Sequence, residues 1–404
     1  AFSGITGTFS PLSMFYTGGT ARTSAGDFNF GQRPFAYTAP SGFKALCTQN
    51  LPTPTIGATS TTQANDYFNA VLYTGDDTNR TIDCGLQTDF IWTKGRNAAV
   101  GNRVSDSVRG ASGGLMYNLV TNLTSAENTD TAVTGIVSNG FTLTGGNHPN
   151  NTGTTYVAWG WKANGAGGSN TAGTITSTVS ANTTSGFSIV TYTGTGANAT
   201  VGHGIGTAPS MILVKGRSGS GSGNSWRVYH SGANASPASG ALYLNSTSAF
   251  TTDATAWNST APTSTVFSLG TDSGVNSTGT YVAYCFAPVA GYSAFGSYTG
   301  NGSTDGPFVY TGFRPRYIML KKSSQASTTY GWQLYDTSRS PYNQALLPGL
   351  WADTSAAEVA DVYGIDILSN GFKVKDSNTN LNASGQTIIY AAFAESPFKY
   401  ALAR

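Results

Sequence analysis

Short runs of alternating apolar and polar residues fill most of the chain, and glycine, asparagine and serine separate one run from the next. Apolar runs such as residues 211–214 and 317–320 have the length of a strand. Alternation with a period of two between turn residues predicts β-strands. The dipeptides Asn139-Gly140 and Asn370-Gly371 favour tight turns between such strands. The pattern therefore predicts an all-β fold.

Comparison of the chain with itself reveals three copies of one unit. Each copy opens with Tyr-Thr-Gly and continues to a strand that ends in lysine. The interval from the opening tyrosine to this lysine is 21, 23 and 23 residues in the three copies. The opening tyrosines are Tyr73, Tyr192 and Tyr298, and the lysines are Lys94, Lys215 and Lys321. A later strand repeats at Tyr156, Tyr281 and Tyr390, with periods of 125 and 109 residues. A unit of this length with short strands is typical of a β-sandwich or jelly roll.

The repeats divide the chain into five segments. We expect residues 1–60 to hold the end of a β-domain and a linker, 61–165 the first sandwich, 166–185 a linker, 186–290 the second sandwich and 291–404 the third. Residues 166–185 are rich in Gly, Ser, Thr and Asn and cannot bury much apolar surface, which indicates a linker or a long exposed hairpin. Residues 356–363 are the best candidate for a helix. The prediction is tandem β-sandwich modules, jelly-roll or lectin-like, with very little helix.

Composition and charge exclude several protein classes. Charged residues make up 10% of the chain, the formal net charge is +2 and there are few Glu residues, so helical bundles and doubly wound α/β enzymes are excluded. No basic cluster is larger than Lys321-Lys322, so a nucleic-acid partner is not expected. The apolar runs are too short for membrane-spanning helices, and we expect no membrane insertion.

No catalytic constellation emerges from the residues that usually carry one. Neither the three histidines nor the three cysteines lie at metal-ligand spacing, and the cysteines are expected to be small buried residues. The residues are His148, His203, His230, Cys47, Cys84 and Cys285. No opposed carboxylate pair can be nominated for glycoside hydrolysis. We therefore predict no enzyme and no cofactor, although Asp and Asn side chains in turns could hold a structural calcium ion.

One charged feature repeats. Asp106 and Arg109 in the first copy correspond to Asp336 and Arg339 in the third, while the second copy has His230 in place of the aspartate. An aspartate and an arginine three residues apart on a turn can form a local ion pair that fixes the turn. The alternative is a polar anchor for sugar hydroxyls.

Aromatic residues make up 12% of the chain and fall into two groups. Repeated aromatics such as Trp159, Trp226 and Trp332 lie in strand patterns and are expected to pack between sheets. Others do not repeat and lie in polar loops, namely Trp257, Tyr342 and Trp351. Exposed rings stack on sugar faces while nearby polar groups bind the hydroxyls, so these three are the candidate ligand-binding residues.

The amino-terminal segment carries the first of two resemblances. GDFNFGQRPF (residues 26–35), PSGFKALC (40–47) and NLP (50–52) resemble the closing strand of a SPRY domain, as found in tail proteins of marine bacteriophages. The three units resemble repeat modules that follow such segments in large phage tail and fibre proteins. Only the end of a SPRY domain is present, so the chain looks like a fragment or product of a longer polypeptide. The resemblance implies an extracellular virion appendage that serves adhesion or structure, and it implies a homotrimer.

Three functions follow as hypotheses. The first is a phage tail-fibre or receptor-binding protein that adheres without catalysis to a glycan or an outer-membrane protein of the host. As a trimer, it should bring outward apolar residues together across a threefold axis. The alternative is a purely structural virion or extracellular filament component, whose modules bind one another through exposed β edges. The third, an enzyme that degrades surface polysaccharide, requires an acidic pair in a groove.

Overall fold

The computed structural model describes residues 54–57, 62–327, 331–344 and 347–396. The chain divides into two compact units after Leu51, and all described residues belong to the second, Pro52–Arg404. The SPRY-like segment and Cys47 lie outside the described residues. Strands dominate, and the all-β prediction is confirmed. The helical elements among the described residues are α1 (Thr379–Asn382), η2 (Ala64–Asp66), η3 (Gly219–Gly221) and η4 (Pro237–Ser239).

Module 1 pairs a large antiparallel sheet, in the order β1-β10-β3-β4-β7, with a small sheet, β2-β9-β8. A separate hairpin joins β5 and β6. The strands are β1 (Phe68–Thr74), β2 (Arg80–Asp83), β3 (Phe90–Gly95), β4 (Arg103–Asp106), β5 (Ala111–Ser112), β6 (Leu115–Met116), β7 (Leu119–Val120), β8 (Val133–Val137), β9 (Gly140–Leu143) and β10 (Thr155–Trp161).

Module 2 repeats this plan with a larger main sheet, β11-β12-β13-β20-β15-β16-β17-β18, and a two-stranded sheet, β14-β19. Its strands are β11 (Gly168–Asn170), β12 (Ser177–Asn182), β13 (Phe187–Thr193), β14 (Ala199–Gly202), β15 (Met211–Ser218), β16 (Arg227–His230), β17 (Gly240–Tyr243), β18 (Thr251–Thr252), β19 (Val266–Leu269) and β20 (Thr280–Phe286).

Module 3 has a main sheet in the order β21-β29-β23-β24-β25-β26 and a small sheet, β22-β28-β27. Its strands are β21 (Ser293–Thr299), β22 (Phe308–Tyr310), β23 (Arg314–Lys322), β24 (Trp332–Asp336), β25 (Leu347–Trp351), β26 (Val359–Tyr363), β27 (Ile365–Leu368), β28 (Gly371–Val374) and β29 (Thr387–Ser396). No helix in the described residues is long and apolar enough to cross a membrane.

Each main sheet is apolar on both faces. In β13, Val190 and Tyr192 pack inside the sandwich of module 2, whereas Phe187 and Ile189 point to the opposite face and join a cluster shared by all three modules. Successive strand residues alternate between faces, so a strand rich in apolar residues of both parities serves two cores. Each module is therefore a sandwich whose main sheet also faces its two neighbours.

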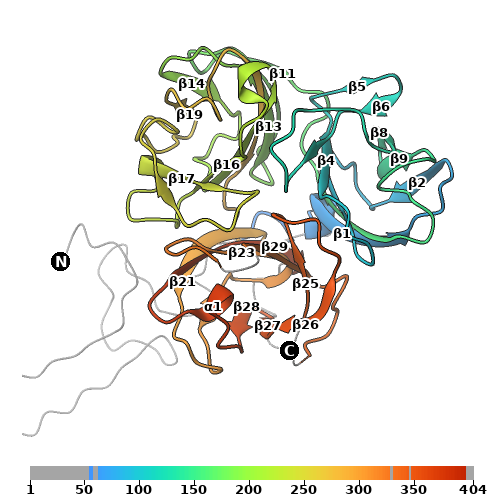
Figure 1. The fold of residues 1–404 in the computed structure, drawn as a ribbon, viewed down its shortest axis with the longest axis vertical. Coiled ribbons are helices and arrows are strands. Elements are labelled where there is room, and N and C mark those ends of the chain that lie inside the picture. The colour runs from blue at the N-terminus through green and yellow to red at the C-terminus, as the bar shows by residue number, and fades with distance from the viewer. Residues whose placement is uncertain (1–53, 58–61, 328–330, 345–346, 397–404) are drawn as a thin grey trace, which may run out of the picture. The chain divides into compact units, whose positions relative to one another are not determined.

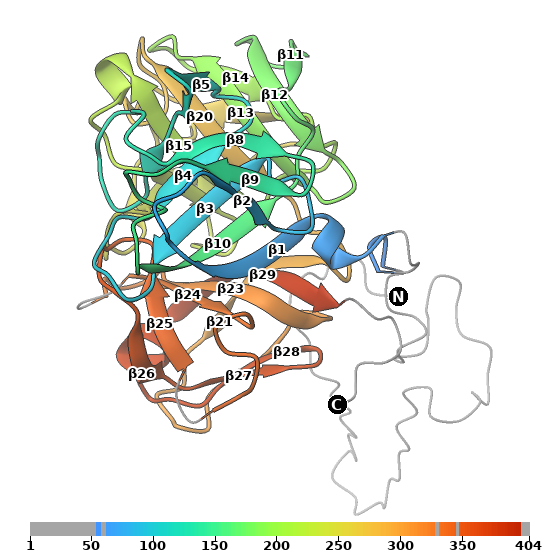
Figure 2. The ribbon, with the colours of Figure 1, turned by 90° about the vertical axis from the view of Figure 1, so that its right-hand side faces the viewer.

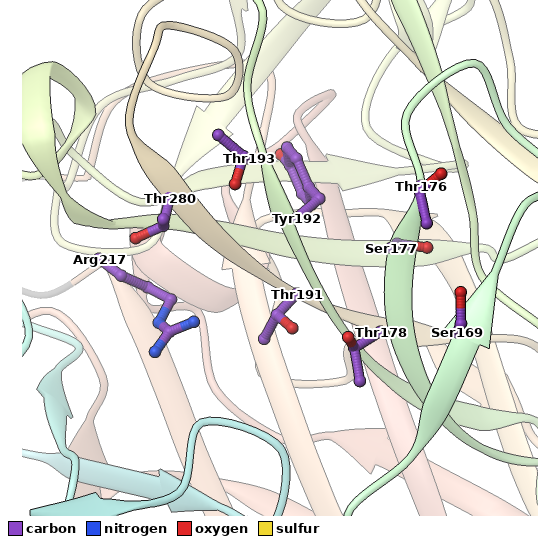
Figure 3. Close-up of a pocket in the computed structure, with 9 residues that line it drawn as sticks. All are labelled: Ser169, Thr176, Ser177, Thr178, Thr191, Tyr192, Thr193, Arg217 and Thr280. Atoms are coloured by element: carbon purple, nitrogen blue, oxygen red, sulfur yellow. The ribbon is translucent and has the colours of Figure 1, made fainter.

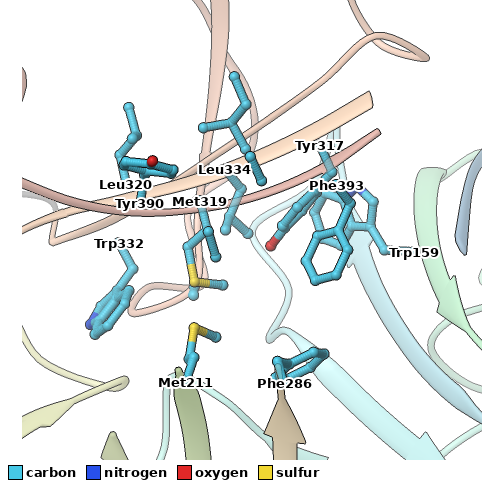
Figure 4. Packing of buried hydrophobic residues seen from close by; sticks show 14 of the residues in the cluster. Trp159, Met211, Phe286, Tyr317, Met319, Leu320, Trp332, Leu334, Tyr390 and Phe393 are labelled. Carbon is cyan, nitrogen blue, oxygen red and sulfur yellow. The ribbon is translucent and has the colours of Figure 1, made fainter. Parts of the chain in front are cut away.

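The three main sheets meet around one common core (Figures 1 and 4). The ring of Trp161 lies 6.2 Å from that of Phe286 and 5.5 Å from that of Phe393, and the two phenylalanine rings are 5.9 Å apart. These three residues occupy the same strand position in the three modules. Figure 2 shows module 1 beside module 3, where Arg316 Nη2 donates to Ala70 O at 3.0 Å. The three modules therefore form a threefold arrangement within one chain, and the homotrimer of such chains stays a prediction.

The structure decides two expectations about secondary structure. Of the two alternatives for residues 166–185, the hairpin is present and the linker is not, because β11 and β12 pair with each other and extend the main sheet of module 2. Small hydroxyls replace apolar contacts there, since Ser177 Oγ donates to Gly202 O at 3.2 Å and Ser180 Oγ accepts from Asn164 N at 2.8 Å. Residues 356–363 contain no helix, because β26 pairs with β25 at the sheet edge and tertiary pairing outweighs local propensity.

The strand register also corrects the third repeat. Thr155, Thr280 and Thr387 each pair with the threonine that follows the opening tyrosine of their module. The third-copy counterpart of Tyr156 and Tyr281 is therefore Ile388 rather than Tyr390. The period between the second and third copies is 107 residues, from 280 to 387.

Candidate functional site

The repeated Asp106 and Arg109 lie in the interface between modules 1 and 2. Arg109 Nε donates to Asp106 Oδ2 at 2.5 Å, and neither side chain is exposed. Asp106 Oδ2 also accepts from Tyr284 of module 2 at 2.7 Å. Glu127 then bridges Arg109 at 3.2 Å and Arg217 at 2.9 Å. Burial opposes the charged form of Asp106, but the charge and hydrogen bonds of Arg109 and the bond from Tyr284 hold its pKa below the usual value.

The same network joins modules 3 and 1. Arg339 Nε donates to Asp336 Oδ2 at 2.6 Å, and Trp159 Nε1 of module 1 donates to the same oxygen at 3.1 Å. Glu358 bridges Arg339 at 3.0 Å and Arg96 at 2.8 Å. Both repeated pairs form, and their burial removes the alternative of an accessible sugar anchor. They hold modules together.

The interface between modules 2 and 3 has the same backbone contacts without the charges. Backbone N–H groups of Glu127 and Glu358 donate to the carbonyls of Arg217 and Arg96, and that of Phe250 donates to Ser323 O at 2.7 Å. Phe250 and Ser323 therefore stand where the other interfaces have glutamate and arginine. His230 and Ala233 replace the aspartate and arginine, and the His230 Nε2 lies 3.0 Å from Tyr390 O of module 3.

The repeated lysine of each module contacts a neighbouring module: that of module 1 contacts module 3, that of module 2 contacts module 1 and that of module 3 contacts module 2. The ammonium groups of Lys94, Lys215 and Lys321 donate to Ser355 O at 2.9 Å, Thr124 O at 3.0 Å and Thr247 O at 3.1 Å. Desolvation of these buried amines lowers the pKa of Lys94 to about 7 and those of Lys215 and Lys321 to about 8. These lysines are contacts between modules, and they do not line an accessible site.

Two of the three predicted ligand-binding residues are buried. Trp257 is 1% exposed and its ring lies 6.0 Å from that of Tyr229 inside module 2. Trp351 is fully buried in β25, and its carbonyl accepts from Asn102 of module 1 at 3.0 Å. Polar neighbours in the sequence suggested exposed loops, but other elements cover both rings. Their assignment to receptor contact is wrong.

Tyr342 is different, because 82% of it is exposed. Two anchors hold its loop in place. Arg314, ion-paired with Glu395, donates to Pro341 O at 3.3 Å. Asn343 Nδ2 donates to Ile367 O at 3.0 Å, and its Oδ1 accepts from Ile367 N at 2.8 Å. The ring is therefore presented to solvent by a fixed loop.

Tyr342 lines a pocket of about 470 Å³ in module 3. The remaining lining residues are Arg314, Pro341, Asn343, Ile367, Leu368, Ser369 and Asn370. Among the interactions of the described chain, none involves the Tyr342 hydroxyl, the Ser369 hydroxyl or the Asn370 side-chain amide. An exposed ring beside hydroxyl and amide groups that engage no other protein group can stack on a sugar face and bind its hydroxyls. Sequence reasoning missed Ser369 and Asn370, which stood out only as turn residues.

A second hollow lies on the main sheet of module 2 and holds about 230 Å³. Figure 3 shows its hydroxyl groups, including Thr178 and Thr191, which are direct neighbours on β12 and β13. Its arginine, Arg217, is held by two bonds of 2.9 Å to Glu127, and the ring of Tyr192 is buried. The hollow offers no exposed ring, so the Tyr342 pocket is the stronger candidate.

The described residues hold no group of three or more His, Cys, Asp or Glu side chains that could bind a metal ion. His148, His203 and His230 are buried, as are the free thiols of Cys84 and Cys285. Desolvation lowers the pKa of His148 to about 3 and that of His230 to about 4.

Residues 63–397 match the model of one protein family, described as a domain of unknown function (DUF7483). The match spans all three modules and their common core as one unit. No curated protein and no solved structure matches the chain.

Proposed function

This chain belongs to the DUF7483 family, and we propose that it is a non-enzymatic adhesion protein of a phage tail or fibre. In this proposal it acts outside the cell and binds a host-surface glycan through the Tyr342 pocket of module 3. The observation that carries the proposal is the ring of Tyr342, 82% exposed on a loop that is anchored on both sides. An exposed aromatic side chain on an anchored loop leaves little backbone ordering entropy to lose when a ligand stacks on the ring.

The pocket fits this role better than catalysis. Its polar groups are hydroxyls, amides and one arginine, and the arginine is engaged with Glu395. The pocket lining contains no carboxylate, and Glu395 is paired with Arg314, so the pocket lacks the opposed acid and base that glycoside hydrolysis requires. These groups support recognition of hydroxyls without bond cleavage.

The test replaces Tyr342 with the residue that the other modules carry. Six residues after Asp106 and after His230 the chain has Ser112 and Ser236, as Tyr342 follows Asp336. Tyr342→Ser should reduce binding to susceptible cells and to a bacterial glycan array by roughly tenfold or more, with the free energy of unfolding changed by less than about 0.5 kcal/mol. Leu72→Thr, at another exposed apolar residue, is the control. Unchanged binding of Tyr342→Ser would reject the pocket.

A second candidate function is a structural virion component whose copies bind one another. It is favoured by β22, an edge strand with the exposed side chains Phe308 and Tyr310. Uncharged edge strands readily pair with other chains. Native mass spectrometry distinguishes a chain of 41.8 kDa from the proposed homotrimer and from open-ended polymers. Polymers without cell binding would favour the structural role.

A further inference from the structure

The three modules differ in the aromatic side chains that they expose. The exposed aromatic side chains among the described residues are Phe308, Tyr310 and Tyr342, with exposures of 47%, 48% and 82%. All three belong to module 3. A chain with three copies of one scaffold thus presents its aromatic surface on only one copy.

Strand register identifies the counterparts of Phe308 and Tyr310. Val309 pairs with Phe372, as Ile82 pairs with Phe141 and Val201 with Phe267, and all six side chains are buried. The residues that flank these buried positions are therefore equivalent. Module 1 carries Thr81 and Asp83, and module 2 carries Thr200 and Gly202, where module 3 carries Phe308 and Tyr310. The scaffold does not require aromatic side chains at these positions.

The aromatic face is continuous with the Tyr342 pocket. Tyr310 pairs with Gly371 of β28, which in turn pairs with Leu368 of β27. Leu368 also lines the pocket, next to Ser369 and Asn370. Gly371 has no side chain, so β28 places no side chain between Tyr310 and Leu368. A path leads from Phe308 across the small sheet to Tyr342.

The charges along this path are already paired. Lys373 lies 2.7 Å from Asp305, and Lys375 lies 3.1 Å from Asp366. Arg314 is ion-paired with Glu395. A surface whose cations each have an acidic partner offers no uncompensated charge to an anionic ligand. It suits an uncharged one.

We infer that the binding site extends from the Tyr342 pocket over β27, β28 and β22 and accommodates an uncharged oligosaccharide of several sugar units. Phe308 and Tyr310 stack on sugar rings beyond the pocket, at positions about 7 Å apart along the strand. Tyr342, Ser369 and Asn370 bind the unit in the pocket. This inference rests on the proposed function and adds the length and charge class of its ligand.

The test uses two double variants that introduce the residues of the other modules, Phe308→Thr/Tyr310→Asp and Phe308→Thr/Tyr310→Gly. The probe is the uncharged bacterial polysaccharide that binds most strongly on the array, cut into fragments of one to six units. Calorimetry should show affinity that rises with length for the unmodified chain. Both double variants should bind the six-unit fragment roughly tenfold more weakly and the shortest binding fragment equally well.

Control variants separate this inference from the proposed function. Leu72→Thr/Leu123→Thr removes two exposed apolar side chains from module 1, at exposures of 41% and 45%, and should leave every affinity unchanged. If Tyr342→Ser abolishes binding but the double variants bind the six-unit fragment normally, the extension is wrong and the proposed function stands. If no array glycan binds, both fail. Binding of anionic glycans alone, or a double variant that alters only self-association, would overturn the inference.

Discussion

Two of the three interfaces between modules contain a buried ionic network, and the third has none. Modules 1 and 2 share Asp106, Arg109 and Glu127 with Arg217, and modules 3 and 1 share the equivalent four residues. Between modules 2 and 3 these positions hold His230, Ala233, Phe250 and Ser323. The backbone contacts nevertheless remain, as does the lysine that crosses to the neighbouring module.

A further donor is common to all three interfaces. Asn102 Nδ2, Trp226 Nε1 and Trp332 Nε1 donate to the carbonyls of Trp351, Val120 and Tyr243 at 3.0, 3.1 and 2.8 Å. The carbonyl groups belong to equivalent strands β25, β7 and β17. The comparison shows that packing and backbone acceptors define the interface, while the ionic network is an addition that neutral residues can replace.

The largest expected effect is the loss of one charge from a network. Arg109→Met leaves Asp106 buried beside Tyr284 without its cation, which should lower the free energy of unfolding by about 3–5 kcal/mol. Urea denaturation measures this loss. Lys375→Met, in a partly exposed pair, is the control and should change it by less than about 1 kcal/mol. The double variant Asp106→Asn/Arg109→Met should recover part of the loss, because no unpaired buried charge remains. Equal effects of Arg109→Met and Lys375→Met would contradict the comparison.

Acid should weaken the neutral interface before the charged ones. His230 Nδ1 accepts from Gly232 N at 3.1 Å, so its Nε2 carries the proton donated to Tyr390 O, and burial lowers its pKa to about 4 from 6.5. Between these values the unfolded chain binds a proton that the folded chain does not. The free energy of unfolding therefore falls as pH drops from 6.5 to 4, by up to about 3 kcal/mol from this residue.

The charged interfaces respond at lower pH. Asp106 and Glu358 have lowered pKa values, so the stability they contribute is lost only as pH falls below the ordinary values of 3.8 and 4.5. Burial also lowers the pKa values of His148 and His203, so they too contribute to the loss of stability as pH falls below 6.5. The measurement is therefore the difference between the unmodified chain and His230→Gln, which should lose about 3 kcal/mol of the pH dependence between 6.5 and 4. Parallel pH profiles would show that His230 does not act in this way.

The architecture could be predicted from the sequence, but the interfaces could not. The alternation of apolar and polar residues between turn residues predicts β-sandwiches. Identical residues at equivalent positions identify the repeated lysines and the Asp–Arg pairs. The equivalent donors at the interfaces are of different residue types, namely Asn102, Trp226 and Trp332. Their acceptors are backbone carbonyls, which any residue supplies, so neither side of these hydrogen bonds shows as a repeat in the sequence. Comparison of the repeats therefore does not predict that the three main sheets pack against one another within a single chain.

The candidate site was only partly predictable for a related reason. Tyr342, Trp257 and Trp351 all have polar neighbours in the sequence, yet only Tyr342 is exposed. The polarity of neighbouring residues in the sequence does not predict whether another strand or loop covers an aromatic ring. The carbonyls of Trp351, Val120 and Tyr243 accept equivalent hydrogen bonds at the three interfaces. Because the three residue types differ, the sequence does not show that these positions are equivalent. Comparison of equivalent positions, more than composition, separates covered rings from the exposed ring.

The smallest expected effect concerns the feature that all interfaces share. A buried amine is removed in each of the variants Lys94→Met, Lys215→Met and Lys321→Met. The loss of its hydrogen bonds to carbonyls destabilises the fold, but a buried amine no longer has to be desolvated. Because the two effects oppose each other, we expect the free energy of unfolding to change by about 1 kcal/mol at pH 7. Because the folded pKa values of about 7 and 8 lie below the ordinary lysine pKa of 10.5, the unfolded chain binds more protons above pH 7. Stability should therefore rise with pH up to about 10 in the unmodified chain, and each variant should lose part of that rise. Urea denaturation from pH 7 to 10 tests this, and Lys215→Met and Lys321→Met, whose lysines share a pKa of about 8, should agree within about 0.5 kcal/mol. A much larger loss for Lys321→Met would mean that the neutral interface depends on its lysine in place of the missing network.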